Sequence, residues 1–544
     1  MEVGKQITSS LIDGELIDDV FKVSQAKKSK KTIFHVLDAF KNIPKLEYDA
    51  ENNKIIRKMN SDGNLIGNPD SKSLNLANRY NLLCYRLSKS KLFTIANVIS
   101  KDENRELPTS TKFQVKPVIY LLGRARPEEH IICLGMLARM KENQLFLEDP
   151  SGAIKLDISE TIWHDGIFTE YCFVLAEGYV MDNIFQAYAI GFPPAESEAI
   201  SREHMGNANF FGPEPDVNPK VSKLYENYQE CDLDECSDYT LNTINIENKL
   251  AEMQSCFVIL SDLYLDKANV KEKFNTLLNG YESDNPPYAF IICGSFISPE
   301  KSVDKDFEKS RKITSNHFSE LALMISKHKN ISKRSRFVFV PHIRDDQGIT
   351  GILPRPPLPD SLSKTFHKAI YVARNHKNVV KGDTNIGVND YNYEIMQNFT
   401  ETENKEKAQD DKYFFTSNPC RIQYMSHNIV VFREDMVTKL FRNCIHSPNL
   451  EGIDAPDSFA QTILSQANLS PMSFDVSPKF NQFDQALNLY PLPDLIVCAD
   501  RYLPYTYESP HNCLVINPSS FSRNNFVFKV FYPFNKTVED SSIP

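Results

Sequence analysis

Apolar residues change their spacing twice along this chain, and the changes predict three regions that are built differently. In the first, residues 1–105, the segments KTIFHVLDAFKNI (31–43) and LNLANRYNLLCYRLSKSKLF (74–93) repeat apolar residues at helical intervals. The earlier segment places four of them on one helical face: Ile33, Val36, Leu37 and Phe40. We therefore predict a short, polar, helical N-terminal region and linker, whose two helices pack on another part of the protein.

In the second region, residues 106–196, the apolar period falls to two. The runs HIICLGMLARM, QLFLEDPSGAIKLDIS, CFVLAEGYVM and FQAYAIGF predict five short strands, with the turn sequence Asp149-Pro150-Ser151-Gly152 between the second and third. Five strands in about 80 residues fit a small closed barrel of the oligonucleotide/oligosaccharide-binding (OB) type. Such barrels often bind single-stranded nucleic acid. Here the strand faces offer mainly aliphatic and acidic side chains, which favours a structural role.

A polar linker over residues 197–250 precedes the third region, residues 251–544. There the strand-like runs FVILSD, YAFIICGSF and RFVFVPH alternate with the helix-like runs KEKFNTLLNGY and HFSELALMISKHK, which is typical of a layered α/β domain. The later runs NIVVFRE, LPDLIVCADRY, LVINPSS and FVFKVFYP predict a second stacked sheet. The polar stretch 366–412 interrupts this pattern and is predicted to be a surface insertion, partly disordered. Overall the pattern predicts a multidomain α+β protein.

Length and composition agree with a folded protein of several domains. The 544 residues suggest two to four domains of roughly 100 to 200 residues each. No apolar run approaches the roughly 18 residues of a membrane span, and the start MEVGKQITSS does not resemble a secretory signal. Most of the eleven cysteines stand in apolar runs, as reduced cysteines do in intracellular proteins. Cys231 and Cys236 have no second pair with which to complete a zinc site.

The net charge of −10, from 61 basic and 71 acidic residues, gives no general basic surface for duplex DNA. The run KKSKK (27–31) is a local exception. It is interpreted as a solvated helix end in preference to a nuclear import signal or a DNA contact.

Candidate chemistry in the third region lies where the strands end, because loops at the carboxyl ends of strands carry the reactive groups of layered α/β proteins. Four such ends are SDLY (261–264), GSFIS (294–298), PHIRD (341–345) and ADRY (499–502). Four loops in this order also form the site of a binuclear metallophosphoesterase. There they carry Asp-x-His, Gly-Asp-x-x-Asp, Gly-Asn-His-Asp and Gly-His-x-His, since two divalent ions need several carboxylates and imidazoles.

This chain does not meet that requirement. Asp262 and Asp345 stand where the first and third loops carry an aspartate. The other ligand positions are occupied by Tyr264, Ser295, Ser298, Arg344, Asp500 and Tyr502. Hydroxyl groups cannot balance two divalent ions, and an arginine would repel them. We therefore predict no catalytic residue, no metal ligand and no cofactor. His342 is expected to be an ordinary loop histidine, and the chain has no phosphate loop, His-Glu-x-x-His or Gly-x-Ser-x-Gly motif.

Several long strings support a family resemblance that covers most of the chain from residue 113 onward. They include LEDPSGAIKLDIS (147–159), ILPRPPLPDS (352–361), TSNPCRIQYMS (416–426), VVFREDMVTKLFRNC (430–444) and YPLPDLIVCADRY (490–502). With an OB barrel followed by a calcineurin-like α/β/β/α phosphoesterase sandwich that lacks its ligands, the chain resembles the B subunits of the eukaryotic replicative DNA polymerases. It is most similar to the epsilon branch of that family.

The resemblance implies a non-catalytic accessory protein in the nucleus. Members of this branch bind the C-terminal region of the catalytic subunit of DNA polymerase epsilon and help to tie the polymerase to the GINS-containing replicative helicase. Contact with DNA would be indirect or weak, and no membrane is involved. Only about 30 residues precede KTIFHVLDAF, fewer than the helical module with which members of this family reach the helicase. The insertion 366–412 also looks private to this chain.

Two other functions remain as alternatives. One is an active metal-dependent phosphodiesterase or nuclease, which would require Asp262 and its neighbours to bind metal after all. The other is a single-stranded DNA-binding module that uses the barrel.

Overall fold

The structure is a computed structural model of the chain. It describes residues 33–49, 54–58, 65, 67–95, 113–123, 125–126, 129–140, 143–205, 209–212, 255–283, 285–300, 307–345, 351–375, 412–446 and 454–544. The expectations for KKSKK (27–31), for Cys231 with Cys236 and for most of the stretch 366–412 lie outside the described residues.

The five predicted strands of the second region form a closed barrel. They are β6 (Ile131–Arg139), β7 (Leu145–Asp149), β8 (Gly152–Asp157), β11 (Phe173–Met181) and β12 (Ile184–Gly191). Neighbours pair in the order β11-β12-β8-β7-β6, and β6 pairs with β11 to close the ring. The turn between β7 and β8 is held by the Asp149 carboxylate, which accepts hydrogen bonds from the backbone N–H groups of Ser151 (2.7 Å) and Gly152 (3.1 Å). The prediction of an OB-type barrel is confirmed in its strand content and closure.

The predicted helix over 74–93 exists as α2 (Ser71–Lys89) and packs on this barrel. Leu83 and Leu87 of α2 lie in one apolar cluster with Leu134, Met136 and Phe173 of the barrel. The smaller elements of this half are β2 (Lys45–Asp49), β3 (Lys54–Lys58), β4 (Phe93–Ile95), β5 (Phe113–Lys116), α3 (Val118–Gly123), β9 (Ile162–Trp163), β10 (Phe168–Thr169) and α4 (Glu198–Met205).

Two six-stranded sheets stack face to face in the third region. The first has the order β16-β15-β14-β13-β23-β24 and the second the order β1-β17-β18-β20-β22-β21. The first comprises β13 (Phe257–Ser261), β14 (Ala289–Cys293), β15 (Arg336–Val340), β16 (Tyr413–Phe415), β23 (Val527–Tyr532) and β24 (Thr537–Ser542). The second comprises β1 (Phe34–Asp38), β17 (Cys420–Tyr424), β18 (His427–Arg433), β20 (Leu495–Ala499), β21 (Tyr505–Glu508) and β22 (Leu514–Asn517).

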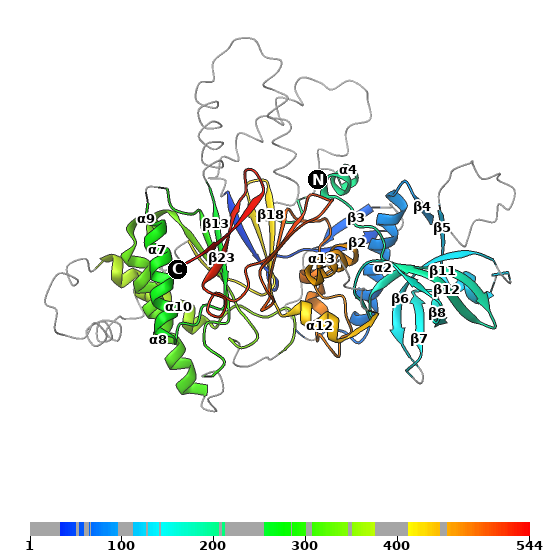
Figure 1. Ribbon diagram of the computed structural model, residues 1–544, viewed down its shortest axis with the longest axis horizontal. Helices are drawn as coiled ribbons and strands as arrows, with labels where there is room; N and C mark the ends of the chain where they lie inside the picture. Colours follow the sequence, from blue (N-terminus) through cyan, green and yellow to red (C-terminus); the bar gives the residue numbers. More distant parts are fainter. Residues whose placement is uncertain are drawn as a thin grey trace, which may run out of the picture.

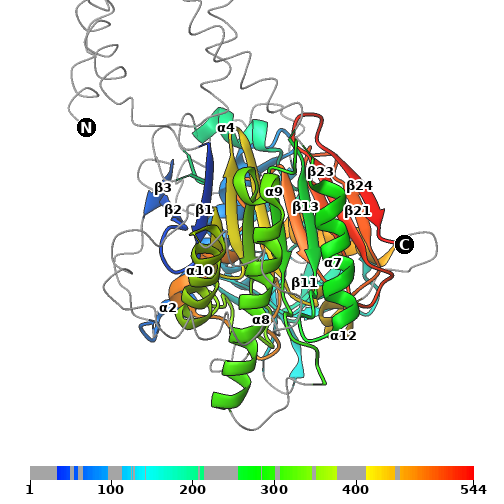
Figure 2. The same ribbon diagram turned by 90° about the vertical axis from the view of Figure 1, so that its left-hand side faces the viewer.

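Helices cover both outer faces, so the domain has four layers, helix, sheet, sheet and helix, with the barrel beyond the last (Figure 1). The helices on the first sheet are α7 (Ala268–Tyr281), α8 (Phe307–Lys327), α9 (Lys329–Arg334) and α10 (Asp360–Asn375). Figure 2 shows them from their own side, running along the strands. The second sheet is covered by α12 (Met436–Arg442), α13 (Ala455–Gln466) and η5 (Asn481–Leu487), and β19 (Cys444–His446) follows α12.

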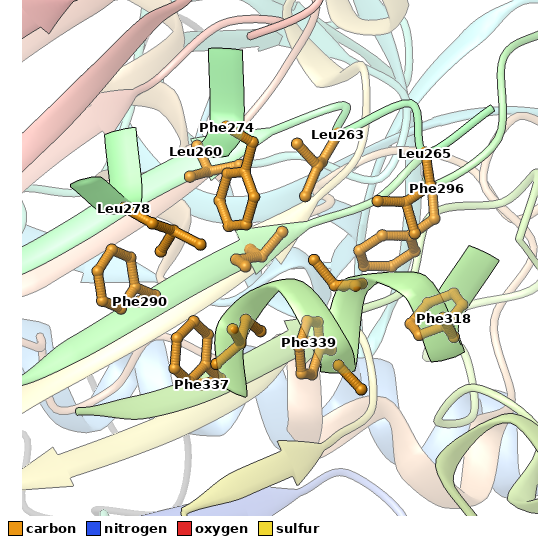
Figure 3. Close-up of a cluster of buried hydrophobic side chains, with 14 of the residues drawn as sticks. Leu260, Leu263, Leu265, Phe274, Leu278, Phe290, Phe296, Phe318, Phe337 and Phe339 are labelled. Carbon is orange, nitrogen blue, oxygen red and sulfur yellow. The ribbon is translucent and has the colours of Figure 1, made fainter. Parts of the chain in front are cut away.

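The outer face of the first sheet is rich in aromatic side chains. Phe290 of β14 and Phe337 of β15 stack with their ring centroids 4.9 Å apart, and Phe318 of α8 meets Phe296 edge-on at 5.2 Å. Figure 3 shows how Leu260 joins this cluster beneath the helices. Fully buried aromatic rings of this kind contribute a large share of the hydrophobic stabilisation of a core, so this sheet is a rigid base for its loops.

Hydrogen bonds and an ion pair fix the barrel against the second sheet's helices. The Gln466 side chain of α13 bonds both the N–H (2.8 Å) and the C=O (2.7 Å) of Phe173 in the barrel. Arg79 of α2 pairs with Asp484 of η5 at 2.9 Å, and both side chains are buried. Strand β10 of the barrel region also pairs with β19. The barrel and the sandwich are therefore joined by direct polar contacts in addition to their covalent connection.

The prediction of a helix over 31–43 was wrong. Residues 34–38 form β1, which pairs antiparallel with β17, so that Phe34 lies opposite Tyr424 and Leu37 opposite Arg421. Phe34 points into the cluster between the sheets, whereas Leu37 points to the other face. The apolar residues of this segment fit the spacing of a helix and also that of a strand. Its β-branched and aromatic residues favour a strand when the edge strand of a sheet is available for pairing. The N-terminal region is consequently of mixed structure.

Two further expectations need correction. The run FVFKVFYP forms β23, which joins the first sheet by pairing antiparallel with β13, so it is not part of the second sheet. The insertion does not begin at residue 366, because α10 continues to Asn375. Phe366, Ala369 and Ile370 of α10 are buried against the first sheet, at the i, i+3, i+4 spacing of a helix face.

We expect Phe34→Ala to lower the free energy of unfolding by about 3 to 5 kcal/mol, because it empties a buried aromatic position between the sheets. Ile33→Ala is the matched control: its side chain is 39% exposed, and the change should cost less than about 0.5 kcal/mol. Chemical denaturation of the full chain measures both. Equal effects of the two variants would contradict the placement of β1.

Candidate functional site

The predicted site forms where the strand ends of the two sheets face each other. Asp262 follows β13 of the first sheet, and Arg433 ends β18 of the second. Asp262 has a left-handed backbone (φ 58°), which aspartate tolerates better than most residues. Its N–H donates to the carbonyl of Cys293 at 3.0 Å. Asp262 is thus turned inward at the junction of the sheets, where it is completely buried.

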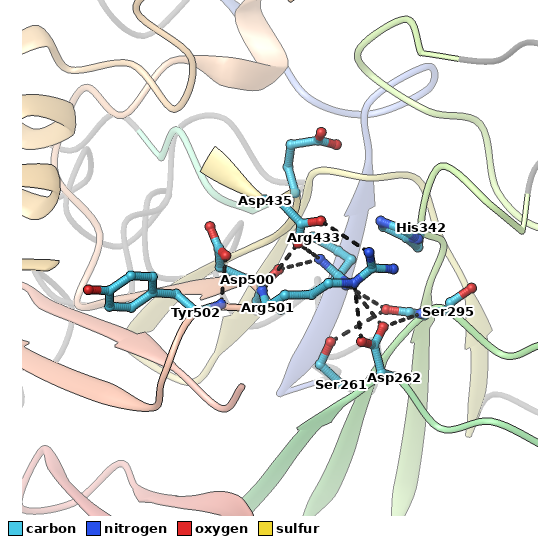
Figure 4. A network of polar contacts seen from close by, with 12 residues as sticks. Ser261, Asp262, Ser295, His342, Arg433, Asp435, Asp500, Arg501 and Tyr502 are labelled. Carbon is cyan, nitrogen blue, oxygen red and sulfur yellow. Dashed lines mark hydrogen bonds and ion pairs between the residues drawn. The ribbon is translucent and has the colours of Figure 1, made fainter. Parts of the chain in front are cut away.

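The guanidinium group of Arg433 occupies the centre of this junction. It donates to the Asp262 carboxylate (2.9 Å), the Asp435 carboxylate (2.9 Å), the Gly294 carbonyl (2.6 Å) and the Ala499 carbonyl (2.9 Å). Figure 4 shows it lying between the two carboxylates, and its side chain has no exposed surface. A buried cation is tolerable only when it is paired and hydrogen-bonded, and Arg433 pairs with two carboxylates and donates from each of its three nitrogens.

Asp262 is held in its charged form by this arrangement. Its Oδ1 also accepts the N–H of Ser295 at 2.8 Å, and the hydroxyl of Tyr264 lies 3.4 Å from Oδ2. Burial alone would raise the pKa of Asp262, but the charge of Arg433 and the hydrogen bonds from Ser295 and Arg433 outweigh it and lower the pKa. Burial alone would lower the pKa of Arg433. The charges of Asp262 and Asp435, and their hydrogen bonds with Arg433, outweigh burial and raise the pKa above its usual value.

Asp345 and Asp500 brace the neighbouring loops through backbone N–H groups. Asp345 accepts from Phe296 (2.8 Å) and His342 (2.9 Å), and Asp500 accepts from Val437 (3.0 Å) and Tyr502 (2.9 Å). Desolvation of each carboxylate raises its pKa to about 6. Both carboxylates are therefore used to fix loop conformation.

The loop after β14 leaves no room for a side chain at Gly294. A Cβ atom there would lie 1.9 Å from the Asp345 Oδ2 atom and 2.9 Å from the His342 backbone nitrogen. Glycine is required at this position by the close approach of the two loops.

The structure places the remaining predicted residues as follows. Ser295 bridges two of the aspartates, since its N–H donates to Asp262 and its hydroxyl to Asp345 (3.2 Å). Ser298 lies apart and bonds Asp266 (2.6 Å). Arg344 and Tyr502 are half-buried, Arg344 on the loop after β15 and Tyr502 against the apolar cluster of the second sheet. His342 is buried, and burial together with the surrounding arginines lowers its pKa.

A binuclear metal centre does not fit these residues. The side chain that lies between the carboxylates is a cation with four hydrogen bonds of its own, and it would repel a divalent ion. Within the described ranges, no group of three or more His, Cys, Asp or Glu side chains is arranged to hold a metal ion. The arrangement binds one buried guanidinium group.

Sequence reasoning missed Arg433, Asp435 and Arg501. The available signal was the charged triplet Arg433-Glu434-Asp435 directly after the apolar run NIVVF, because a charge at the end of a buried strand must find a partner. Glu434 forms a second buried ion pair, with Arg355, and also contacts Lys439 at 2.5 Å. The Nη1 of Arg355 donates to the backbone carbonyl of Arg433 (3.2 Å), so the two networks are connected.

Comparison with known proteins gives matches along most of the chain. The B-subunit family of DNA polymerases alpha and epsilon matches residues 257–507, and the OB-fold domain of DNA polymerase epsilon subunit 2-like proteins matches residues 69–194. The second match includes α2, in agreement with its packing on the barrel.

Relatives named DNA polymerase epsilon subunit 2 are similar over most of their length. The human protein is 35% identical over 99% of this chain and 89% of its own length. The bovine protein is 36% identical over 94% of this chain and 84% of its own length. The protein from Drosophila melanogaster is 31% identical over 94% of this chain and 83% of its own length. None of the helices that the structure describes is long and apolar enough to cross a membrane.

We expect Arg433→Met to lower the free energy of unfolding by about 3 to 5 kcal/mol, because Asp262 would remain buried without its partner. The double variant Arg433→Met/Asp262→Asn removes both charges and should be more stable than Arg433→Met alone. Arg442→Met, on an exposed arginine of α12, serves as the control and should stay within about 0.5 kcal/mol of wild type. Chemical denaturation of the full chain measures all three. A double variant less stable than Arg433→Met would argue against the pairing.

Proposed function

Because this chain belongs to the family of DNA polymerase epsilon B subunits, we propose that it is a non-catalytic accessory subunit that scaffolds the catalytic subunit's C-terminal region. The observation that carries the proposal is the 35% identity to human DNA polymerase epsilon subunit 2 over 99% of this chain. That span includes the residues of both the barrel and the sandwich.

The buried guanidinium supports the non-catalytic part of the proposal. Hydrolysis of a phosphodiester by a binuclear site needs metal ions that activate water and balance the charge of the transition state. Arg433 balances charge, but it cannot bind and deprotonate water as a metal ion does. Its four hydrogen bonds also leave it no freedom to approach a substrate.

A scaffolding role is consistent with the way the modules are joined. Gln466 and the ion pair of Arg79 with Asp484 hold the barrel on the sandwich, so a partner that contacts both modules would meet a preformed surface. Preformed surfaces reduce the entropic cost of association.

The link to the GINS-containing replicative helicase and the nuclear location follow from the same family resemblance. Both belong to the proposal for this chain, and the barrel would contact DNA only indirectly or weakly. The net charge of −10 supports this last point, since direct duplex binding relies on a basic surface.

We expect the full chain to copurify in a 1:1 complex with the C-terminal region of the catalytic subunit of DNA polymerase epsilon from the same organism. A permanent complex of this kind buries about 2,000 Å² or more and survives gel filtration. Coexpression with a tag on the catalytic region, followed by gel filtration and mass measurement, tests it. The tagged region expressed alone is the control, and separate elution of two folded proteins would refute the scaffolding proposal.

The same preparation should show no metal-dependent phosphodiesterase activity. With manganese and bis(p-nitrophenyl) phosphate, we expect the rate of the wild-type chain to equal that of Asp262→Ala, whose fold is checked by circular dichroism. Asp262 would be a ligand in any active site at this junction, so this variant is the matched control. Turnover that Asp262→Ala abolishes would show that the protein is an enzyme.

A further inference from the structure

Three arginines stand on loops that follow strands at the Arg433 junction. Arg344 follows β15, Arg501 follows β20 and Arg523 follows β22. The guanidinium carbon of Arg523 lies 5.9 Å from the centre of the Tyr264 ring. Partial burial, followed by the charges of Arg501 and Arg523, lowers the pKa of Arg344. The Nε atom of Arg501 lies 3.7 Å from Oδ2 of Asp262, and the Tyr264 hydroxyl lies 3.4 Å from the same oxygen. Arg501 and Arg523 therefore both lie beside the pair of Asp262 and Tyr264, and we refer to Arg344, Arg501 and Arg523 as the arginine edge.

Several N–H donors of the arginine edge are shielded from water and have no acceptor. They are Nη1 of Arg344 and both Nε and Nη2 of Arg501, none of which is hydrogen-bonded in the part of the chain that the structure describes. The carboxylates nearest to Arg501 are those of Asp262 and Asp435, each at 3.7 Å. That separation is too long for a hydrogen bond. Shielded donors of this kind are costly unless something accepts from them.

The acidic groups that the structure describes in this region are already engaged. Asp262 and Asp435 accept hydrogen bonds from Arg433, Asp345 accepts backbone N–H groups, and Asp266 accepts from Ser298. Among the described residues, Arg344 and Arg523 form no ion pair. Within the described ranges, Arg344 and Arg523 therefore add positive charge that no carboxylate offsets directly.

We propose that the arginine edge binds a phosphate group of a small molecule, either inorganic phosphate or pyrophosphate or the phosphate of a nucleotide. A phosphate presents several anionic oxygens in different directions, so guanidinium groups from three loops can each donate to it. Arginine donors hold the anion by hydrogen bonds and charge, and they do not activate water. The site therefore binds phosphate without hydrolysing it. Phosphate binding here depends on the arginines alone and is independent of the proposed scaffolding function.

Isothermal titration calorimetry of the full chain with sodium pyrophosphate, at constant ionic strength, tests the site. We expect saturable binding of one equivalent with a Kd on the order of 1 mM or below. Arg344→Gln should weaken it by about tenfold, since one charge-assisted donor group is lost. Arg344 is half-buried and forms no ion pair in the described region, so the variant should fold, which a thermal melt checks. Arg344→Lys should recover part of the affinity because it restores charge without the planar fork.

Arg126→Gln is the matched control, because Arg126 is an exposed arginine near the barrel, and it should bind like wild type. Parallel titrations with inorganic phosphate and with dAMP distinguish the sources. Equal affinities indicate recognition of the phosphate alone, and tighter binding of dAMP indicates a nucleotide. The proposal is overturned if no probe binds saturably, which would mean that the donors are satisfied from within the chain. It is also overturned if Arg344→Gln binds like wild type or if Arg126→Gln weakens binding equally.

Discussion

The buried contact between Arg433 and Asp262 is the constraint on which the junction depends. It joins the end of β18 in one sheet to the end of β13 in the other, and the same guanidinium also donates to backbone carbonyls from both sheets. Each charge alone would be strongly unfavourable in this position, because burial removes its hydration. Both charges are therefore paired only when the two sheets are stacked in this relative position. The loops that carry Ser295 and Asp435 then close around a centre that is already fixed.

This arrangement explains why aspartates stand in a place that does not suit a metal. Asp345 and Asp500 each accept one backbone N–H group from their own loop and one from a neighbouring segment. Asp262 accepts one backbone N–H group and a hydrogen bond from the Arg433 guanidinium group. A carboxylate can accept several hydrogen bonds at once, which neither serine nor asparagine does equally well. The structural task of these three residues is therefore sufficient to account for them without any chemistry.

The spacing of apolar residues predicted correctly those helices and strands whose formation depends on residues close together in the sequence. The alternating runs of the barrel and the strand and helix order from β13 to β15 were right, because side-chain period follows directly from backbone geometry. The strand β1 was mispredicted, since its partner β17 lies in a distant part of the sequence, as the pairing of Phe34 with Tyr424 shows. The assignment of β23 failed for the same reason. The central role of Arg433 could not be seen from spacing, because its partners Asp262 and Gly294 become neighbours only when the two sheets stack.

A fixed arginine and a bound metal ion differ in what they leave available to an anion. A metal ion in an open site lowers the pKa of its own water and supplies a nucleophile next to the phosphate it holds. A guanidinium group supplies charge and N–H donors only, and here all three nitrogens of the central one already donate to Asp262, Asp435 and two carbonyls. Arg344 and Arg501 carry N–H donors that have no acceptor among the described residues. A hydrolase combines attraction for an anion with activation of water. The proposed phosphate site separates these two properties, because arginines on the loops would attract the anion while the central cation cannot activate water.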